Sequence, residues 1–451
     1  MENTNSPTLK RTLTLKYVVF FGLAFMAPKT FFSTYGVAVD STSGMMPTAY
    51  AIALVVMLFT AYSYAQLVKA FPKTGAAYTF TQKSISPHIG FIVGWTIIID
   101  YIFSPMISAL IVGISLKAYF PSIPMFVWII LFIVIITAVN ILGIKLAAKL
   151  NTYMLFLQFL LFALFFILSI KGLLEGKGTG TLFSTVPFYD PEISAPALLS
   201  VIPILCFSFL GFDAVTTLSE ETKDPTRTLP KAIYFITMIG GFLFITSSYF
   251  AQLIFPEFHS FTNPESAYLE IAMYIGGNIF VSFFVAVGLT STTASAVASG
   301  TSASRILYAM GRENVLPKKI FGYLSPKYRT PVFNILLIGG IALSALFLNL
   351  TTAVSLISFG ALFAFFFVNL SVVSYYFFQK KQSSFKGTIQ YLIIPLTGAA
   401  LIGLFFINLD KHSLILGGTW LLIGFIYLLN LTKMFRQPPP ELALRKLNNK
   451  A

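Results

Sequence analysis

The chain has 451 residues, of which 56% are hydrophobic and only 10% are charged. A soluble domain carries about 25% charged residues, and the mean hydropathy of +0.82 is too apolar for a surface in contact with water. The composition therefore excludes a soluble enzyme and a disordered chain, and it leaves an integral membrane protein. Because the apolar segments run for about 20 residues, they predict helices and not the short alternating strands of a membrane barrel.

Apolar runs bounded by charges, proline or glycine predict twelve membrane-spanning helices. The predicted spans are 16–38, 47–69, 88–118, 124–143, 151–171, 197–219, 231–255, 274–300, 331–349, 353–378, 388–408 and 414–433. No soluble domain is expected between them and no Walker-type phosphate-binding motif is present, so we expect no ATP-driven transport within this chain.

The basic residues alternate from loop to loop. With the N-terminus placed in the cytoplasm, only Lys117, Lys171, Lys177 and Lys411 of the 30 Lys and Arg residues fall on the outer side, and Lys29 falls inside a helix. The positive-inside rule then predicts a protein of a bacterial-type cell membrane with both termini in the cytoplasm. The formal charge of +14 therefore reflects basic residues gathered in the cytoplasmic loops and does not indicate a nucleic-acid partner.

The first and sixth predicted helices contain matching interruptions. Segments 20–30 (FFGLAFMAPKT) and 207–217 (FSFLGFDAVTT) are identical at five of eleven positions. Pro28 weakens one helix near mid-membrane, and Gly211 with Asp213 weakens the other. Interrupted helices at corresponding places of two inverted halves indicate the binding site of a secondary transporter. The alternative is an ordinary kink of packing origin.

Several longer blocks resemble the amino acid–polyamine–organocation (APC) permeases, and within them the bacterial putrescine importers. The blocks are 75–80 (GAAYTF), 82–88 (QKSISPH), 94–95 (GW), 100–101 (DY), 206–213 (CFSFLGFD), 219–222 (SEET), 305–314 (RILYAMGREN) and 329–331 (RTP). The resemblance covers nearly the whole chain. It implies an all-α membrane protein with the LeuT-like fold and cation-coupled import of a small amine or amino acid.

The LeuT-like fold also implies a domain organisation. It places inverted repeats at 16–171 and 197–378, which together form a ten-helix core at 16–378. Helices 11 and 12 follow at 388–433, with a cytoplasmic N-terminus at 1–15 and a cytoplasmic tail at 434–451. Helices 1 and 6 are broken, and a bundle of helices 1, 2, 6 and 7 rocks against the others in alternating access.

Three ionisable residues stand out inside the predicted spans, Lys29, Asp100 and Asp213, because a charge at membrane depth costs roughly 2.5–3.5 kcal/mol on insertion scales. Asp213 sits at the helix 6 break, where a substrate ammonium or a transported proton needs an anionic partner; the alternative is a helix cap. Asp100 is followed by Tyr101, and a carboxylate beside a phenol ring suits a terminal ammonium. The alternative for Asp100 is internal pairing with Lys29.

Lys29 departs from the pattern of the putrescine importers, in which we expect an uncharged residue. It has three possible roles: pairing with one of the two acids, binding a substrate carboxylate near the free N–H groups of a half-helix, or presenting its ammonium to helix 8 hydroxyls in place of a metal cation. Thr292 and Thr293 supply such hydroxyls, which can also hold sodium or only allow close packing. On balance these residues favour proton coupling.

The sequence thus predicts a proton-coupled importer of putrescine or a related polyamine, with no catalytic residue, metal site or cofactor. The expected substrate-binding residues are Asp213, Asp100, Tyr101, Ala24, Phe25, Met26, Ala27, Ser208, Gly211 and Phe212. The expected coupling or charge-partner residues are Lys29, Asp213, Thr292 and Thr293. One alternative is a proton- or sodium-coupled amino acid permease in which Lys29 engages the substrate carboxylate, and another is a channel or membrane sensor. The expected partners are a small amine or amino acid, a coupling proton or sodium ion, and the lipid bilayer.

Overall fold

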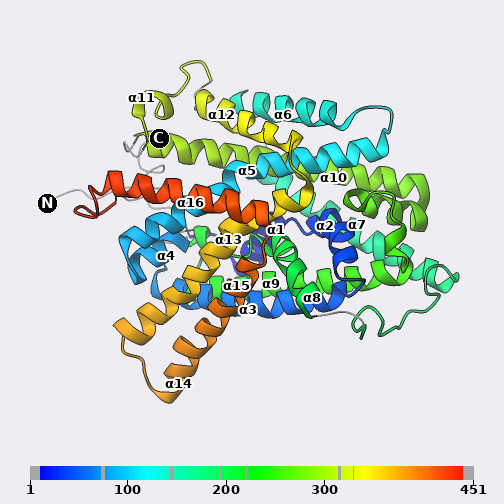
Figure 1. The fold of residues 1–451 in the computed structure, drawn as a ribbon, viewed down its shortest axis with the longest axis horizontal. Helices are drawn as coiled ribbons and strands as arrows, with labels where there is room; N and C mark the ends of the chain where they lie inside the picture. Colours follow the sequence, from blue (N-terminus) through cyan, green and yellow to red (C-terminus); the bar gives the residue numbers. More distant parts are fainter. Residues whose placement is uncertain are drawn as a thin grey trace.

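The computed structural model describes residues 11–72, 77–142, 147–191, 195–219, 221–312, 316–328 and 330–439. Parts of the predicted termini, at 1–10 and 440–451, therefore lie outside the described residues, as do residues 75 and 76 of the first resemblance block. Across the described ranges the chain is almost entirely helical (Figure 1), and strand-type pairing is limited to one isolated bridge between Leu13 and Thr222.

Ten helical segments of the described chain are long and apolar enough to cross a membrane, as the all-α membrane prediction requires. They are α3 (Met46–Ala70), α5 (Pro87–Tyr119), α6 (Met125–Leu142), Tyr153–Leu174 of α7 (Ala147–Leu174), Leu198–Leu218, α9 (Pro225–Ile254), Pro264–Tyr308, Leu350–Gln379, Phe385–Ile407 and α16 (Lys411–Leu431). A bent pair, α1 (Leu15–Met26) with α2 (Thr30–Ser41), and the shorter apolar segment Val332–Leu346 fall at two further predicted positions. The exact count of twelve spans and the LeuT-like inverted repeat stay predictions.

Two helices extend well beyond their predicted limits. Helix α9 begins at Pro225 instead of residue 231, and α10 (Ala267–Arg312) continues past the predicted end at residue 300. Non-helical backbone at Gly277 (φ +63°) divides α10, so the predicted start at residue 274 lies near the beginning of its longer part. Proline at the first helical position explains the start of α9, because its ring already has a helical φ and its missing N–H has no acceptor there. Hydropathy detects only the apolar part of a helix, so it misses polar turns that continue past the membrane.

The first span is interrupted between Met26 and Thr30, where α1 and α2 meet at a bend of 48°. Ala27 adopts a left-handed conformation with φ 47°, and its N–H donates to the carbonyl of Leu23 at 3.2 Å. Such a residue ends a helix by satisfying one of its last carbonyls. Pro28 follows and has no N–H with which to continue the α1 ladder.

The span that begins with α8 (Ala195–Cys206) is interrupted near its middle. It continues as the 3-10 turns η1 (Phe207–Phe209) and η2 (Ala214–Leu218), and Gly211 between them has φ +116°. A β-carbon built on Gly211 would lie 2.8 Å from the backbone nitrogen of Met26 and 3.0 Å from its Cα. The two interruptions are therefore in direct backbone contact, and only glycine fits between them.

Large aromatic side chains fill the space beside these interruptions. Phe31, Tyr50, Phe209 and Phe244 are fully buried and come from α2, α3, η1 and α9. Phe31 and Phe244 are stacked 6.3 Å apart, and Phe209 meets Phe244 edge to face at 5.2 Å. Edge-to-face and offset ring pairs add about 0.5–1.5 kcal/mol each beyond their buried area, so this cluster fixes the four elements relative to one another.

The last helix, α16, is fastened to α5 by two tryptophans. Trp95 Nε1 donates to the carbonyl of Trp420, and Trp420 Nε1 donates to the carbonyl of Trp95, both at 3.0 Å. The two indoles stack 5.1 Å apart. Gly424 allows this approach, because a β-carbon there would lie 2.3 Å from the Trp95 ring. Helix α5 also packs along α10 and α13 (Leu350–Val372), so it forms the centre of the helix assembly (Figure 1).

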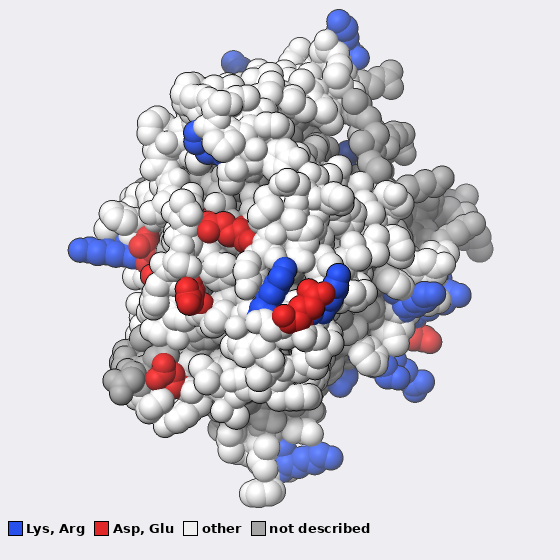
Figure 2. Space-filling model, turned by 90° about the vertical axis from the view of Figure 1, so that its right-hand side faces the viewer, with Lys and Arg blue, Asp and Glu red and all other residues white. Residues whose placement is uncertain are grey.

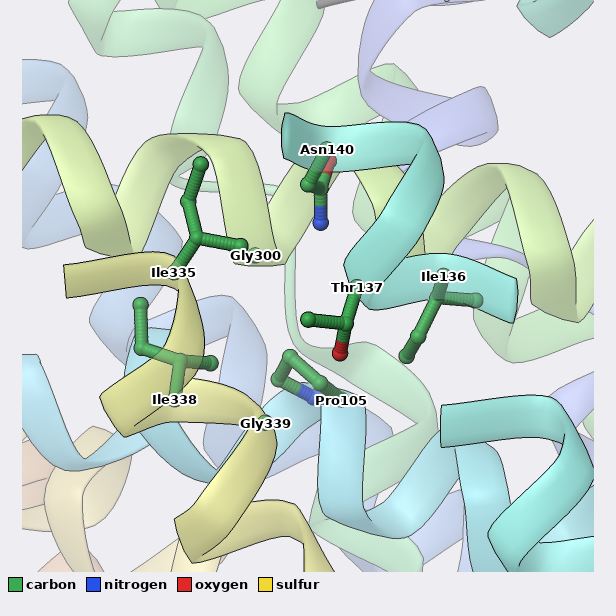
Figure 3. A pocket seen from close by; sticks show the side chains of 8 residues that line it. All are labelled: Pro105, Ile136, Thr137, Asn140, Gly300, Ile335, Ile338 and Gly339. Atoms are coloured by element: carbon green, nitrogen blue, oxygen red, sulfur yellow. The ribbon is translucent and has the colours of Figure 1, made fainter. Parts of the chain in front are cut away.

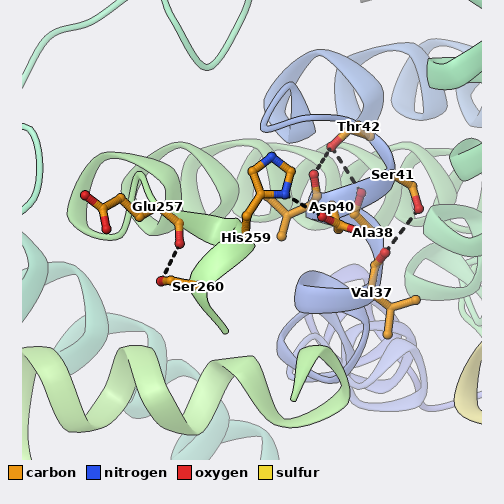
Figure 4. Close-up of polar contacts among 9 residues, drawn as sticks. Val37, Ala38, Asp40, Ser41, Thr42, Glu257, His259 and Ser260 are labelled. Atoms are coloured by element: carbon orange, nitrogen blue, oxygen red, sulfur yellow. Dashed lines mark hydrogen bonds and ion pairs between the residues drawn. The ribbon is translucent and has the colours of Figure 1, made fainter. Parts of the chain in front are cut away.

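The far end of α2 is held by the segment between α9 and α10. His259 Nδ1 lies 2.8 Å from Asp40 Oδ1, and both side chains are exposed (Figure 4). A β-carbon on Gly36 would lie 2.1 Å from the carbonyl oxygen of Pro264. Glu265 Oε1 accepts a hydrogen bond from the Leu350 N–H at 3.0 Å, so the same segment also contacts the start of α13. Seen from the right-hand side of Figure 1, most of the surface is uncharged, with scattered acidic and basic side chains (Figure 2).

Candidate substrate and coupling site

Asp213 lies in the interruption of the span that starts with α8, directly before η2. Its side chain is half-buried, and Oδ2 accepts a hydrogen bond from the Tyr64 hydroxyl of α3 at 3.4 Å. The Asp213 side chain makes no standard capping hydrogen bond to η2, but backbone groups of Gly211, Asp213 and Ala214 interact with its carboxylate. Within the described residues, no cation forms an ion pair with Asp213.

Asp100 and Tyr101 lie on α5, near its middle. Asp100 is half-buried and is close enough to Asp213 for the two carboxylates to interact electrostatically. Tyr101 is within electrostatic range of both acids. The structure thus brings Asp213 near Asp100 and Tyr101, although the sequence places it more than a hundred residues from them. Pairing of Asp100 with Lys29 is absent from the described ion pairs.

Lys29 is buried at the start of α2, and its ammonium points to α10. Nζ donates to the Gly288 carbonyl at 3.0 Å and to Thr292 Oγ1 at 2.5 Å. The backbone N–H of Lys29 donates to Gln158 Oε1 of α7 at 3.2 Å. One residue therefore connects the interruption of the first span to two other helices. The Lys29 ammonium thus contacts a hydroxyl and a carbonyl of α10, and no ion pair between Lys29 and an acid is found among the described residues.

The other predicted residues of the first span lie around its interruption. Ala24 and Ala27 are half-buried, Met26 is buried at 2% exposure, and Phe25 is 49% exposed. A β-carbon on Gly240 of α9 would lie 2.6 Å from the Met26 sulfur, so Met26 is packed between α9 and Gly211. This segment therefore contributes the backbone of Met26, which contacts Gly211, and Phe25 does not lie in the buried interior.

Three predicted residues of the second interruption are fully enclosed. The Ser208 hydroxyl shares a hydrogen bond with the Tyr50 hydroxyl at 3.3 Å, and Phe212 packs edge to face against Tyr64. Gly211 contacts Met26, as described above. On α10, Thr293 is half-buried and donates to its own helix at Leu289, so it takes no part in the Lys29 contact.

A small hollow lies further along α5, between α5, α6, α10 and α12 (Val332–Ala342). Asn140 and Thr137 of α6 point into it (Figure 3). Asn140 Oδ1 accepts a hydrogen bond from Thr301 at 2.8 Å. The lining has no charged side chain, so this hollow does not offer a partner for an ammonium.

Three participants were not identified from the sequence: Tyr64, Gln158 and Gly288. Tyr64 is one of 21 tyrosines, and nothing local distinguishes it. Gly288 contributes a backbone carbonyl, which no side-chain pattern reveals. Gln158 gave a usable signal, because an amide inside a predicted membrane helix is costly without a partner.

Asp100 and Asp213 lie within electrostatic range of each other, and neither forms an ion pair with a basic side chain among the described residues. Two such anions repel each other, and a ligand that carries positive charge removes that repulsion. The phenol of Tyr101 adds a ring face for the same ligand. The site is therefore suited to a cation, whereas the ammonium of Lys29 already has two acceptors of its own.

Comparisons with known proteins give a family and several relatives of this chain. The amino acid permease family model matches residues 17–428. The chain is 44% identical over 440 residues to the low-affinity putrescine importer PlaP of Escherichia coli strain K12, covering 97% of each chain. It is 26% identical to the branched-chain amino acid permease BcaP of Bacillus subtilis strain 168, covering 93% of this chain and 92% of the relative. It is 27% identical to the mouse cationic amino acid transporter 4, covering 82% and 61%.

The family match extends over most of the chain, the identity to a full-length relative is high, and the described spans are those of a multi-pass membrane protein. The chain therefore belongs to the amino acid permease family of the amino acid–polyamine–organocation superfamily, and it is a transporter and not an enzyme.

Proposed function

We propose that the chain imports putrescine or a related polyamine across the cell membrane by proton symport, with both termini in the cytoplasm. The observation that carries the substrate is the pair Asp100 and Asp213, two carboxylates within electrostatic range and without a basic partner among the described residues. Putrescine carries two ammonium groups, so it neutralises both acids at once. The putrescine importer that is 44% identical to this chain supports the same substrate class.

In this proposal Asp213 and Asp100 bind the ammonium groups, and Tyr101 stacks on the ligand. Backbone at 24–27 and 208–212 lines the pocket, at the contact between Gly211 and Met26. The free backbone groups of an interrupted helix are tolerated at membrane depth only where they line a cavity or are buried in protein. The LeuT-like repeat and the rocking of helices 1, 2, 6 and 7 are part of the same proposal.

The proposal for coupling rests on Lys29. Sodium at this position requires oxygen ligands from the first span and from α10. The Lys29 ammonium already uses the Gly288 carbonyl and the Thr292 hydroxyl. A built-in cation there supports a transporter that does not need sodium. Ionisable groups within membrane helices commonly act as proton relays, so Lys29 and Asp213 are the proposed coupling residues.

An amino acid substrate is the second candidate, because relatives of 26–27% identity are named as amino acid transporters. It requires a cationic partner for the substrate carboxylate. Lys29 was the expected partner, but its ammonium donates to α10 in the described structure. This contact supports the diamine over the amino acid.

The test is uptake of labelled putrescine into proteoliposomes under an imposed proton gradient, without sodium, with excess unlabelled amino acids as competitors. We expect uptake that requires the gradient and that amino acids do not reduce. The Asp213→Asn and Asp100→Asn variants should raise the KM for putrescine, whereas Asp40→Asn, an exposed acid outside the site, is the matched control. Absence of putrescine uptake, with entry of labelled amino acid instead, would overturn the proposal.

A further inference from the structure

Tyr64 is a buried side chain on α3, a helix to which the sequence assigned no site residue. Its relative exposure is 1%, and its hydroxyl donates to Asp213 Oδ2 at 3.4 Å. A hydrogen bond from a neutral donor to an ionised acceptor is stronger than one between neutral groups. Tyr64 therefore influences which way the Asp213 carboxylate points.

Three aromatic rings from three different elements hold the Tyr64 ring in place. Phe80 of α4 (Ala77–Ser84) lies 6.2 Å away, Phe212 lies 5.8 Å away, and Phe365 of α13 lies 5.9 Å away. All three pairs are edge to face, with interplanar angles of 71°, 88° and 87°. Packing therefore fixes the position of the hydroxyl independently of its hydrogen bond.

The carboxylate that this hydroxyl orients sits in the least regular part of the fold. Asp213 lies between two short 3-10 turns and follows Gly211, whose φ is +116°. A side chain on such backbone lacks the support of a regular helix. Backbone groups of Gly211, Asp213 and Ala214 interact with the Asp213 carboxylate from within its own segment, and Tyr64 supplies a side-chain donor from another element.

We propose that Tyr64 is a positioning residue that holds the Asp213 carboxylate toward Asp100, so that the two acids match the two ends of one diamine. This inference rests on the proposed function, and it adds a specificity determinant to it. Tyr64 acts through Asp213 and does not itself bind the ligand. The separation of the two carboxylates then selects ligands by the number of carbons between their ammonium groups.

The experiment compares purified wild-type protein with the Tyr64→Phe variant, which loses one oxygen and keeps all three ring contacts. Binding of labelled putrescine is measured by a scintillation proximity assay, with unlabelled 1,3-diaminopropane and cadaverine as competitors. We expect the Kd for putrescine to rise about ten-fold, as for loss of a hydrogen bond to a charged group. We also expect the preference for putrescine over the shorter and longer diamines to narrow.

The matched control is Tyr268→Phe, a buried tyrosine of α10 whose hydroxyl shares a hydrogen bond with Ser115 and not with a carboxylate. Its Kd and chain-length preference should equal those of the wild type. An equal loss of affinity in both variants would assign the effect to general packing and overturn the inference.

A double-mutant cycle with Asp213→Asn separates this inference from the proposed function. If Tyr64 acts through Asp213, Tyr64→Phe has no further effect on the Kd once Asp213 is neutral. Additive losses, or an unchanged Kd in Tyr64→Phe while Asp213→Asn weakens binding, would overturn the role of Tyr64 alone. An unchanged Kd in Asp213→Asn would overturn the proposed site itself, and the role of Tyr64 with it.

Discussion

Replacing Gly211 with alanine is expected to disturb the contact between the two interrupted spans. Gly211 has φ +116°, which an L-residue rarely adopts. The added β-carbon would lie 2.8 Å from the backbone nitrogen of Met26, 3.0 Å from its Cα, and 2.8 Å from the ring of Phe25. The ring can rotate away, but the backbone of Met26 is fixed by the end of α1.

The magnitude follows from two terms. A non-glycine residue in such a backbone conformation costs roughly 1–3 kcal/mol, and pushing packed backbone apart for an extra methyl costs roughly 1–3 kcal/mol more. The variant should therefore lose roughly 2–6 kcal/mol of folding free energy. Because this is a large fraction of the roughly 5–15 kcal/mol that stabilises a typical domain, we expect a lower Tm and a smaller folded fraction.

Thermal unfolding of the detergent-solubilised protein, followed by tryptophan fluorescence and size-exclusion chromatography, measures this loss. The matched control is Gly340→Ala in α12, where no atom lies within 4 Å of the added β-carbon. Alanine gains about 1 kcal/mol over glycine inside a helix, so the control should keep or raise its Tm. A Gly211→Ala variant as stable as Gly340→Ala would refute the close contact between the two interruptions.

Three further outcomes follow from described contacts. Lys29→Met removes two hydrogen bonds to α10, each worth about 1.5–3 kcal/mol. Uptake into proteoliposomes should then no longer depend on the proton gradient, and retained dependence would contradict the coupling role. Asp40→Asn breaks an exposed pair with His259, worth about 0–1 kcal/mol; initial uptake rates should stay within about two-fold of wild type, and a larger loss would show a role beyond surface pairing. Trp420→Phe removes the indole N–H that donates to the Trp95 carbonyl. The Tm should fall by an amount equivalent to about 1 kcal/mol, and an unchanged Tm would show that the tryptophan pair does not stabilise the fold.

The all-helical membrane fold was predictable because bilayer thickness imposes apolar runs of about 20 residues. Helix ends were less predictable. The polar first turns of α9 and the last turns of α10 continue outside the apolar run, and hydropathy does not register them. The positions of Pro28 and Gly211 gave useful information, since each disrupts a helix through its own backbone chemistry.

Each acid of the candidate site could be identified from the sequence, because a charge inside an apolar span is costly. The proximity of the two acids could not be predicted. Asp100 and Asp213 each stand out as a charge inside an apolar span, whereas their proximity depends on how α5 packs against the second interruption. The ammonium of Lys29 was expected to contact acids or hydroxyls. In the structure it contacts the Thr292 hydroxyl and also a backbone carbonyl of α10, which the sequence does not reveal. Tertiary contacts of this kind leave no mark on the local sequence.

The two halves of the first span differ in how firmly they are held. Eight of the twelve residues of α2 are buried, and contacts to α7, α10 and the segment before α10 secure it at both ends. Helix α1 has only four buried residues, and Tyr17 on it is 64% exposed. Helix α1 therefore exposes more of its surface to the bilayer than α2 does. The first half of the span is consequently bounded by lipid as well as by protein, whereas the second half is bounded mainly by protein.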